Sequence, residues 1–499
     1  MSIPKVMGIE TEYGITVPDS PEFNPVLASS ILINSYAASA ARRVRWDYEE
    51  ESPLRDARGF EAGTLDVGPG VEPPGDEELG LANVILSNGA RYYVDHAHPE
   101  YSTPECTNPH DLVVHDRAGE RVLAASMDRA VGALPPGQRI IVYKNNTDGK
   151  GASYGTHENY LVDRACPFAR IVRDFTPYLV TRQIFTGAGM LGGGAAGRPI
   201  PYQMSQRSDF FEVEVGLETT LKRPIINTRD EPHADPQKYR RLHVIIGDAN
   251  MSEVATYLKI GTAAIVLRMI EDEALSSDWL LENPVQAVRS ISHDIECREA
   301  VRLRDGRDVR AVDVQWGIFE QAQKYFTRNE PDPWTPAVMT RWERMLSAID
   351  SDPLTLHREV DWVAKFKLIS SYRDRHGCEW NDSRLRMLDL QYHDVREGKG
   401  LAGVLYRSGK LERLTTDDEI ERAVTMPPRD TRAYFRGRCL AQFGNAISAA
   451  SWDSVIFDVG GETLQRVPMM EPLRGTEQHT KSLLDACRTA ADLVGRLQG

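Results

Sequence analysis

The sequence predicts a mixed α and β fold, because two different hydrophobic periods occur in one chain. Over residues 5–17 and again over 91–95, apolar and polar side chains alternate, which is the period of a half-buried strand. Residues 254–380 are instead typical of helices, and Ser252 is placed to cap the first of them. The apolar positions that open this segment recur at helical spacing: Val254, Tyr257, Leu258 and Ile265.

The composition is that of an ordinary globular protein, with 41% hydrophobic and 26% charged residues among 499. No stretch approaches the roughly 20 apolar residues that a membrane helix needs, and no secretory signal pattern opens the chain, so we expect no membrane association. Six cysteines lie far apart without a Cys-x-x-Cys pair, which fits a reducing cytoplasm. The net charge of −14 disfavours nucleic acid as a partner and requires local arginine clusters to hold any anionic ligand.

The first strand presents Glu10 and Glu12 side by side, because residues two apart share one face of a strand. From residue 47 to 78 there are eleven acids and only two arginines, and glycine and proline crowd residues 67–75. Such a segment is typical of an extended mobile loop, which we place at about residues 47–80.

The rest of the chain also predicts both helices and strands. Glycine-rich residues 187–201 lack the Gly-Lys-Ser/Thr of a phosphate-binding P-loop, so a flexible loop is expected there. After Pro427 and Pro428 an arginine-rich piece leads to a final helix over about 477–497, which indicates a small C-terminal domain at 426–499 beside a domain at 1–425. Five further strands are expected at residues 139–144, 156–162, 210–215, 242–246 and 454–459.

Several acids and histidines on these strands are the ligand types of a hard divalent cation. Mg²⁺ prefers oxygen ligands, and two carboxylates on one strand face are costly to bury without a compensating charge. A single glutamate could equally lie on a solvated face, and a single histidine in the core. The candidates are Glu10, Glu12, Glu100, Glu105, His157 and His243. Asp95 opens a dense run of acids and histidines in which composition alone does not separate base, nucleophile and ligand.

Arginines supply the second kind of candidate, since a guanidinium offers a bidentate fork to phosphate. Arg207 and Arg229 are favoured because they lie in polar, turn-like contexts. Trp452 could stack on a base or belong to the core. The weaker candidates for a phosphate clamp are Arg240, Arg241, Arg432 and Arg436.

Six ordered segments of the chain resemble the actinobacterial Pup ligase and Pup deamidase family. This resemblance implies an α+β fold similar to glutamine synthetase, in which a curved antiparallel sheet with flanking helices holds ATP and Mg²⁺ on its concave face beside a small C-terminal domain. The segments are residues 7–14, 93–101, 150–160, 243–250, 430–437 and 451–454.

Within the family, the resemblance favours the hydrolase, which deamidates the C-terminal glutamine of Pup and removes Pup from lysines. Two features look like the deamidase version: an insert that contains residues 46–59, and a histidine, His96, directly after Asp95. A ligase would instead consume ATP to attach Pup. The implied cofactors are Mg²⁺ and ATP, or ADP with phosphate, and the implied partners are Pup and pupylated proteins. Pup is expected to be acidic and disordered, and the enzyme to be a cytoplasmic monomer.

The resemblance also implies roles for individual residues. Asp95 matches the position of a nucleophile, or of a base in another account. His157 and His243 would help to hold metal or nucleotide. Metal-ligand positions are matched by Glu10, Tyr93 and Glu100, with Glu12 as a further candidate. The nucleotide would be contacted by Thr103, by Arg207 and Arg229 at the phosphates, by Trp452 at the adenine, and by Arg432.

Overall fold

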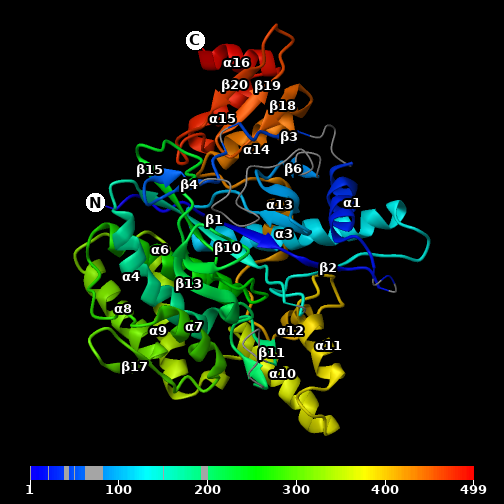
Figure 1. The fold of residues 1–499 in the computed structure, drawn as a ribbon. Coiled ribbons are helices and arrows are strands. Elements are labelled where there is room, and N and C mark those ends of the chain that lie inside the picture. Colours follow the sequence, from blue (N-terminus) through cyan, green and yellow to red (C-terminus); the bar gives the residue numbers. More distant parts are fainter. Residues whose placement is uncertain are drawn as a thin grey trace.

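A six-stranded antiparallel sheet with the order β15–β10–β1–β8–β7–β6 lies at the centre of the molecule (Figure 1). The computed structural model describes residues 2–18, 20, 22–38, 44–49, 51–61, 82–149, 151–192 and 200–498. The strands of the sheet are β1 Met7–Glu12, β6 Asn83–Ile85, β7 Arg91–Asp95, β8 His98–Ser102, β10 Thr156–Asp163 and β15 Tyr239–Val244. The single strand expected over residues 5–17 is in fact two, because β2 (Gly14–Thr16) leaves this sheet and pairs with β9 (Ile141–Tyr143).

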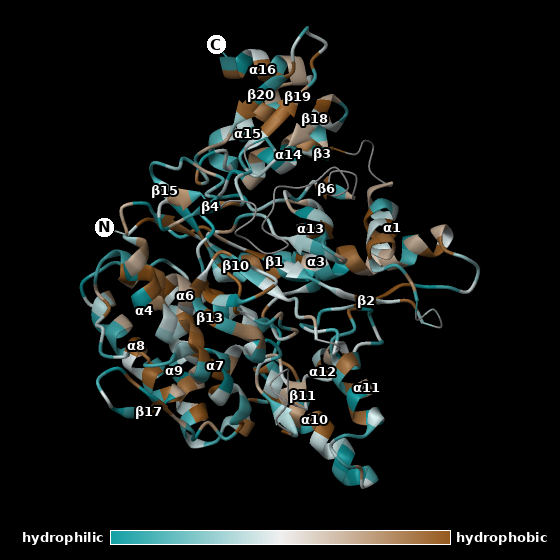
Figure 2. Ribbon diagram, viewed as in Figure 1, coloured by the Kyte–Doolittle hydropathy of each residue, from teal (hydrophilic) through white to brown (hydrophobic). Residues whose placement is uncertain are grey.

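One face of the sheet is apolar and covered by helices. Ile9, Val162 and Leu242, from three neighbouring strands, are buried in one cluster with α4 (Phe168–Thr181) and α6 (Glu253–Glu271). Figure 2 shows apolar residues on these two helices and hydrophilic residues on many of the outer loops. Because side chains alternate along a strand, the opposite face receives the polar residues, and this is the face that carries the site.

Helix α6 begins where the sequence predicts. Ser252 caps it by accepting a hydrogen bond from the backbone N–H of Ala255, and Glu253 in the first turn and Arg268 in the last complement the helix dipole. A hairpin of β16 (Ala300–Arg302) and β17 (Asp308–Arg310), which was not predicted, interrupts the helical segment that follows. That segment contains α7 Pro284–His293, α8 Ala311–Phe326, α9 Thr335–Ser351 and α10 Asp361–His376.

Two helices near the N-terminus were not expected from the sequence, α1 (Pro25–Ala37) and α3 (Pro109–Ala130). On the buried side of α3, Asp116 and Glu120 accept hydrogen bonds from Lys144 Nζ at 2.6 and 3.0 Å. These buried charges interrupt the apolar period that would otherwise have predicted the helix.

None of the helices in the described part of the chain is both long enough and apolar enough to cross a membrane.

Apart from α11 and α13, the other elements that precede the C-terminal sheet in the sequence are short. The short elements and these two helices are α5 Gln183–Thr186, α11 Ser383–Tyr392, α12 Leu401–Arg407, α13 Asp417–Thr425, β11 Met190–Leu191, β12 Tyr202–Gln203, β13 Phe211–Gly216 and β14 Arg223–Asn227.

A second, four-stranded sheet lies at the C-terminal end, at the top of Figure 1. Its order is β20–β19–β18–β3, and β3 (Arg45–Trp46) runs parallel to β18, so the edge strand comes from the N-terminal part of the chain. The single helix expected at 477–497 is divided near Cys487. The other elements here are β18 Ile447–Ala450, β19 Ser454–Phe457, β20 Gln465–Pro468, α14 Ala433–Phe443, α15 Glu477–Ala486 and α16 Ala490–Gln498.

The acidic segment expected to form a loop at about 47–80 is described in part. Residues 47–49 and 51–61 continue from β3 and contain the short strands β4 (Arg55–Asp56) and β5 (Phe60–Glu61). Asp56 is buried and accepts hydrogen bonds from Thr228 Oγ1 at 2.6 Å and from the guanidinium of Arg58. Residues 62–80 lie outside the described residues.

Glu105 joins the C-terminal elements to the region of the central sheet. Its carboxylate accepts hydrogen bonds from Arg432 Nε at 2.8 Å and from Arg436 Nη2 at 2.5 Å, and both arginines are buried. Burial alone would raise the pKa of Glu105, but the two arginines lower it to about 2. The carboxylate is therefore charged at neutral pH and stabilises the contact between the two parts.

Candidate active site

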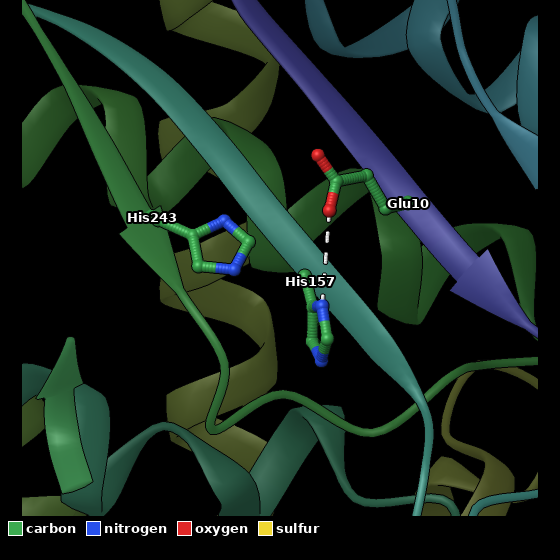
Figure 3. A group of neighbouring side chains, drawn as sticks. All are labelled: Glu10, His157 and His243. Carbon is green, nitrogen blue, oxygen red and sulfur yellow. Dashed lines mark ion pairs between the residues drawn. The ribbon is translucent and has the colours of Figure 1, made fainter. Parts of the chain in front are cut away.

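The register of three strands brings Glu10, His157 and His243 together on the polar face (Figure 3). Glu10 on β1 lies opposite His157 on β10, with 3.7 Å between Oε2 and Nδ1. The rings of His157 and His243 are 5.1 Å apart, and one ligand atom from each of the three residues lies within 4.8 Å of the others. One carboxylate and two imidazoles at this spacing could hold a divalent cation.

Hydrogen bonds from neighbouring side chains orient this group. Asn159 Nδ2 donates to Glu10 Oε1 at 2.9 Å, and Asn159 Oδ1 lies 3.0 Å from Nδ1 of His243. Arg241 is 3.6 Å from Glu10. Asn159 therefore connects two of the candidate ligands, which is the kind of support that fixes metal-binding side chains.

A second group contains Glu12, Asp95 and His96, whose ligand atoms also lie within 4.8 Å of one another. Glu12 accepts a hydrogen bond from the backbone N–H of Gly155 at 3.0 Å. His96 Nδ1 lies 3.1 Å from Asp95 Oδ2, and His96 adopts a left-handed backbone with φ of 51°. The sequence identifies His96 only as part of a family motif, because no local pattern predicts the left-handed turn that brings its ring to Asp95.

Tyr93 and Glu100 face each other across β7 and β8. The phenol of Tyr93 donates to Glu100 Oε1 at 2.5 Å, whereas Glu100 Oε2 is buried without a hydrogen-bond partner among the described residues. Burial and the charges of Asp95 and Glu10 raise the pKa of Glu100 well above its usual range. An unpartnered buried carboxylate oxygen beside two other carboxylates is the environment that a bound cation would satisfy.

The ionisation states of the neighbouring histidine and carboxylates also suit cation binding. Burial lowers the pKa of His243, so its imidazole is neutral at pH 7 and able to bind metal. Burial would raise the pKa of Glu10, but hydrogen bonding to His157 and the charge of Arg241 hold it well below its usual range. His96 likewise outweighs the effect of burial and lowers the pKa of Asp95, whose side chain is 35% exposed. Asp95 is thus a charged and partly exposed carboxylate.

A cavity of about 80 Å³ adjoins Glu10 and contains three of the residues predicted to bind nucleotide, Thr103, Trp452 and Arg432, in its wall. Thr103 Oγ1 accepts a hydrogen bond from the backbone N–H of Ile9 at 3.0 Å. The guanidinium of Arg432 is engaged by Glu105 and by the carbonyl oxygens of His233 and Met469. Arg432 therefore lines the cavity while its Nε and Nη1 donate to the protein.

Arg207 and Arg229 each bury an Nε with no hydrogen-bond partner among the described residues. Burial, together with the charge of nearby Arg223, lowers the pKa of Arg207 to about 10, so Arg207 stays cationic. Because the charges of Arg207 and Arg223 repel each other, an anionic ligand such as a phosphate would stabilise this pair. Arg223 was not predicted from the sequence, because only the fold brings it beside Arg207.

The family model described as Pup-ligase protein matches residues 5–456 of this chain. The chain belongs to this family. Among curated members of the Pup-ligase family, the Depupylase of Acidothermus cellulolyticus is 58% identical, and the Pup deamidase/depupylase of Mycolicibacterium smegmatis is 51% identical. In both cases the similarity covers 99% of each chain. The Pup–protein ligase 1 of Rhodococcus erythropolis is 45% identical over 81% of this chain and 90% of the ligase.

Solved structures from the Pup-ligase family have the same fold. The complex between Pup and its ligase PafA superimposes with a TM-score of 0.81 at 33% identity, covering 99% of this chain and 92% of the other. A complex of PafA with ADP gives a TM-score of 0.73 at 37% identity over 81% of this chain and 89% of the other. The predicted glutamine-synthetase-like α+β fold is confirmed.

Proposed function

We propose that this chain hydrolyses amide bonds of Pup, deamidating its C-terminal glutamine to glutamate and cleaving the isopeptide bond between Pup and a lysine. The observation that carries this proposal is the sequence identity to its relatives. The two depupylases are 58% and 51% identical to this chain over 99% of its length, whereas the Pup–protein ligase of Rhodococcus erythropolis is 45% identical over 81% of it. A ligase that consumes ATP is the alternative.

We propose Mg²⁺ and ATP as cofactors, because the donor atoms fit both. Glu10, Glu12, Asp95 and Glu100 would supply the carboxylate oxygens that Mg²⁺ prefers, one of them an unpartnered oxygen, and His157 and His243 would add nitrogen ligands beside Glu10. The guanidinium groups of Arg207 and Arg229, each with a buried and unpartnered Nε, would hold phosphates, and the cavity lined by Thr103 and Trp452 would hold the base. When bound, the cation would neutralise these carboxylates and polarise the substrate carbonyl.

Asp95 is the residue that we propose for the chemical step. One of its carboxylate oxygens would bond to the carbonyl carbon of the glutamine side chain, the carbon–nitrogen bond would break, and the nitrogen would leave with a proton from solvent. The leaving group is ammonia in deamidation and the lysine amine in depupylation. Water would then cleave the Asp95–glutamyl anhydride, restoring the carboxylate. Direct attack by water with Asp95 as base gives the same products.

The decisive experiment is intact-mass spectrometry of Pup ending in glutamine, incubated with the protein, Mg²⁺ and either ATP or a non-hydrolysable analogue. Deamidation should raise the mass by about one unit with either nucleotide, because hydrolysis of an amide does not need the energy of ATP. A parallel sample should contain Pup ending in glutamate and a lysine-bearing protein. Attachment of Pup in that sample, with ATP consumed and no mass change in the first, would assign the ligase activity instead.

Substitution of a cation ligand gives a further prediction. Glu10→Gln should weaken Mg²⁺ binding by about 10- to 100-fold, since the amide keeps the size of the side chain but removes the charge that attracts the cation. The measurement is calorimetric titration of the nucleotide-free protein with Mg²⁺. Glu212→Gln, on an exposed position of β13, is the matched control and should bind like the unsubstituted protein. Equal Mg²⁺ affinity in both variants would remove Glu10 from the proposed site.

A further inference from the structure

The guanidinium of Arg91 is held between two aromatic rings. Its central carbon lies 3.8 Å from the ring centroid of Trp46 and 3.8 Å from that of Tyr93. The Arg91 side chain is only 13% exposed, and its Nε donates to Asn83 Oδ1 at 3.2 Å. A planar cation with an aromatic ring on each side is tightly restrained in orientation, which an ammonium group cannot reproduce.

One end of this stack reaches the proposed nucleotide cavity. The ring of Trp46 lies edge-on to that of Trp452, with 5.4 Å between centroids and an interplanar angle of 73°, and Trp452 lines the cavity. Trp46 Nε1 also donates to Glu51 Oε1 at 2.6 Å. Because Trp46 is part of β3, its position is set by the C-terminal sheet.

The other end of the stack reaches the carboxylates. Tyr93, which carries Arg91 on its ring, donates through its phenol to Glu100. Glu100 lies opposite Glu12 across β1 and β8, on the same face as Asp95. Contacts therefore run without interruption from Trp452 through Trp46, Arg91 and Tyr93 to Glu100.

We propose that Arg91 is a positioning residue that couples occupation of the nucleotide cavity to the geometry of the catalytic carboxylates. A nucleotide that packs against Trp452 restrains Trp46, which fixes Arg91 and hence the phenol of Tyr93 against Glu100. This inference rests on the proposed function, and it gives a physical reason for a hydrolase to depend on a nucleotide whose energy it does not use. Energetic coupling of this kind needs differential contacts at both ends, and the stack provides them.

Arg91→Lys keeps the charge and removes the planar stack. At saturating ATP and Mg²⁺, kcat for Pup deamidation should fall by about 10-fold or more, while the KM for Pup changes by less than about 2-fold, because the orientation of the carboxylates is lost and the Pup-binding surface is not. Arg373→Lys is the matched control, because Arg373, on helix α10, also lies over an aromatic ring, with 4.3 Å between its guanidinium carbon and the ring centroid of Trp380. It should leave both constants unchanged.

A binding measurement tests the coupling without turnover. The measurement is made in EDTA, so that no shared cation transmits the effect. Tyr93→Phe should weaken binding of a non-hydrolysable ATP analogue by about 3- to 10-fold. Arg91→Lys should raise the Kd of the analogue by a smaller factor in the Tyr93→Phe background than in the unsubstituted protein. Additive effects on the analogue Kd, or an unchanged kcat in folded Arg91→Lys protein, would overturn the role of Arg91. Absence of Pup conversion by the unsubstituted protein would instead refute the proposed function, and the binding cycle would still decide on Arg91.

Discussion

Replacing Asp95 with asparagine should reduce deamidation and depupylation by about 10³-fold or more, because the variant loses the negative charge required of either a nucleophile or a base. The fold should be preserved, since the side chain is partly exposed and asparagine has the same size. Conversion of Pup by mass spectrometry and the thermal midpoint of unfolding, measured on the same preparation, would separate chemistry from stability.

The control for this variant is Asp305→Asn. Asp305 is also partly exposed and paired with a neighbouring cation, Arg307, but it lies in the turn between β16 and β17. Its substitution should leave the rate unchanged. A rate for Asp95→Asn within about 10-fold of the unsubstituted protein would exclude Asp95 from the chemical step, since removal of a general base or nucleophile typically costs 10²-fold or more.

Glu105→Gln should produce the largest loss of stability, about 3–5 kcal/mol, because two buried arginines would lose the charged partner that they share. The thermal midpoint and the denaturant midpoint should both fall. Glu412→Gln is the control, since Glu412 pairs with Arg341 and both side chains are 29% exposed, and such a partly exposed pair contributes about 1 kcal/mol or less. Equal losses in the two variants would show that Glu105 is no more important than a surface residue.

The same carboxylate predicts an acid-dependent loss of stability. The folded-state pKa of Glu105 is about 2, below the ordinary value of 4.5. Its stabilisation is therefore fully present above pH 4.5 and is lost as the pH falls toward 2. The difference in thermal midpoint between the unsubstituted protein and Glu105→Gln should shrink over this interval. A constant difference between pH 5 and pH 2.5 would contradict the assignment.

Local spacing was enough to predict parts of the site. Glu10 and Glu12 share a face because of the two-residue period of a strand, and this holds in the structure. The meeting of Glu10 with His157 and His243 depends instead on which strands pair and in which register, and no local pattern encodes that pairing. Residue type alone made each of the three a candidate cation ligand, but it did not predict that they meet.

The features that escaped prediction share a physical cause. Helix α3 buries charges that are neutralised by Lys144 from a distant strand end, and the repulsion between the charges of Arg223 and Arg207 likewise acts between separate segments. The hydrogen bonds from Arg432 and Arg436 to Glu105 join residues that are more than 300 positions apart in the sequence. Each contact exists only after the chain has folded, so hydrophobic periodicity carries no signal for it.

The pairing of β3 with β18 has a consequence for how the chain is made. Arg45 leaves the ribosome about 400 residues before its partner Ala449, so the sheet at the C-terminal end cannot close until synthesis is nearly complete. Until then, strand β3, which contains Trp46, lacks its partner strand β18. We expect nascent chains truncated before residue 447 to expose this segment to proteases, and the last step of folding to be slow because its contacts are so far apart in sequence.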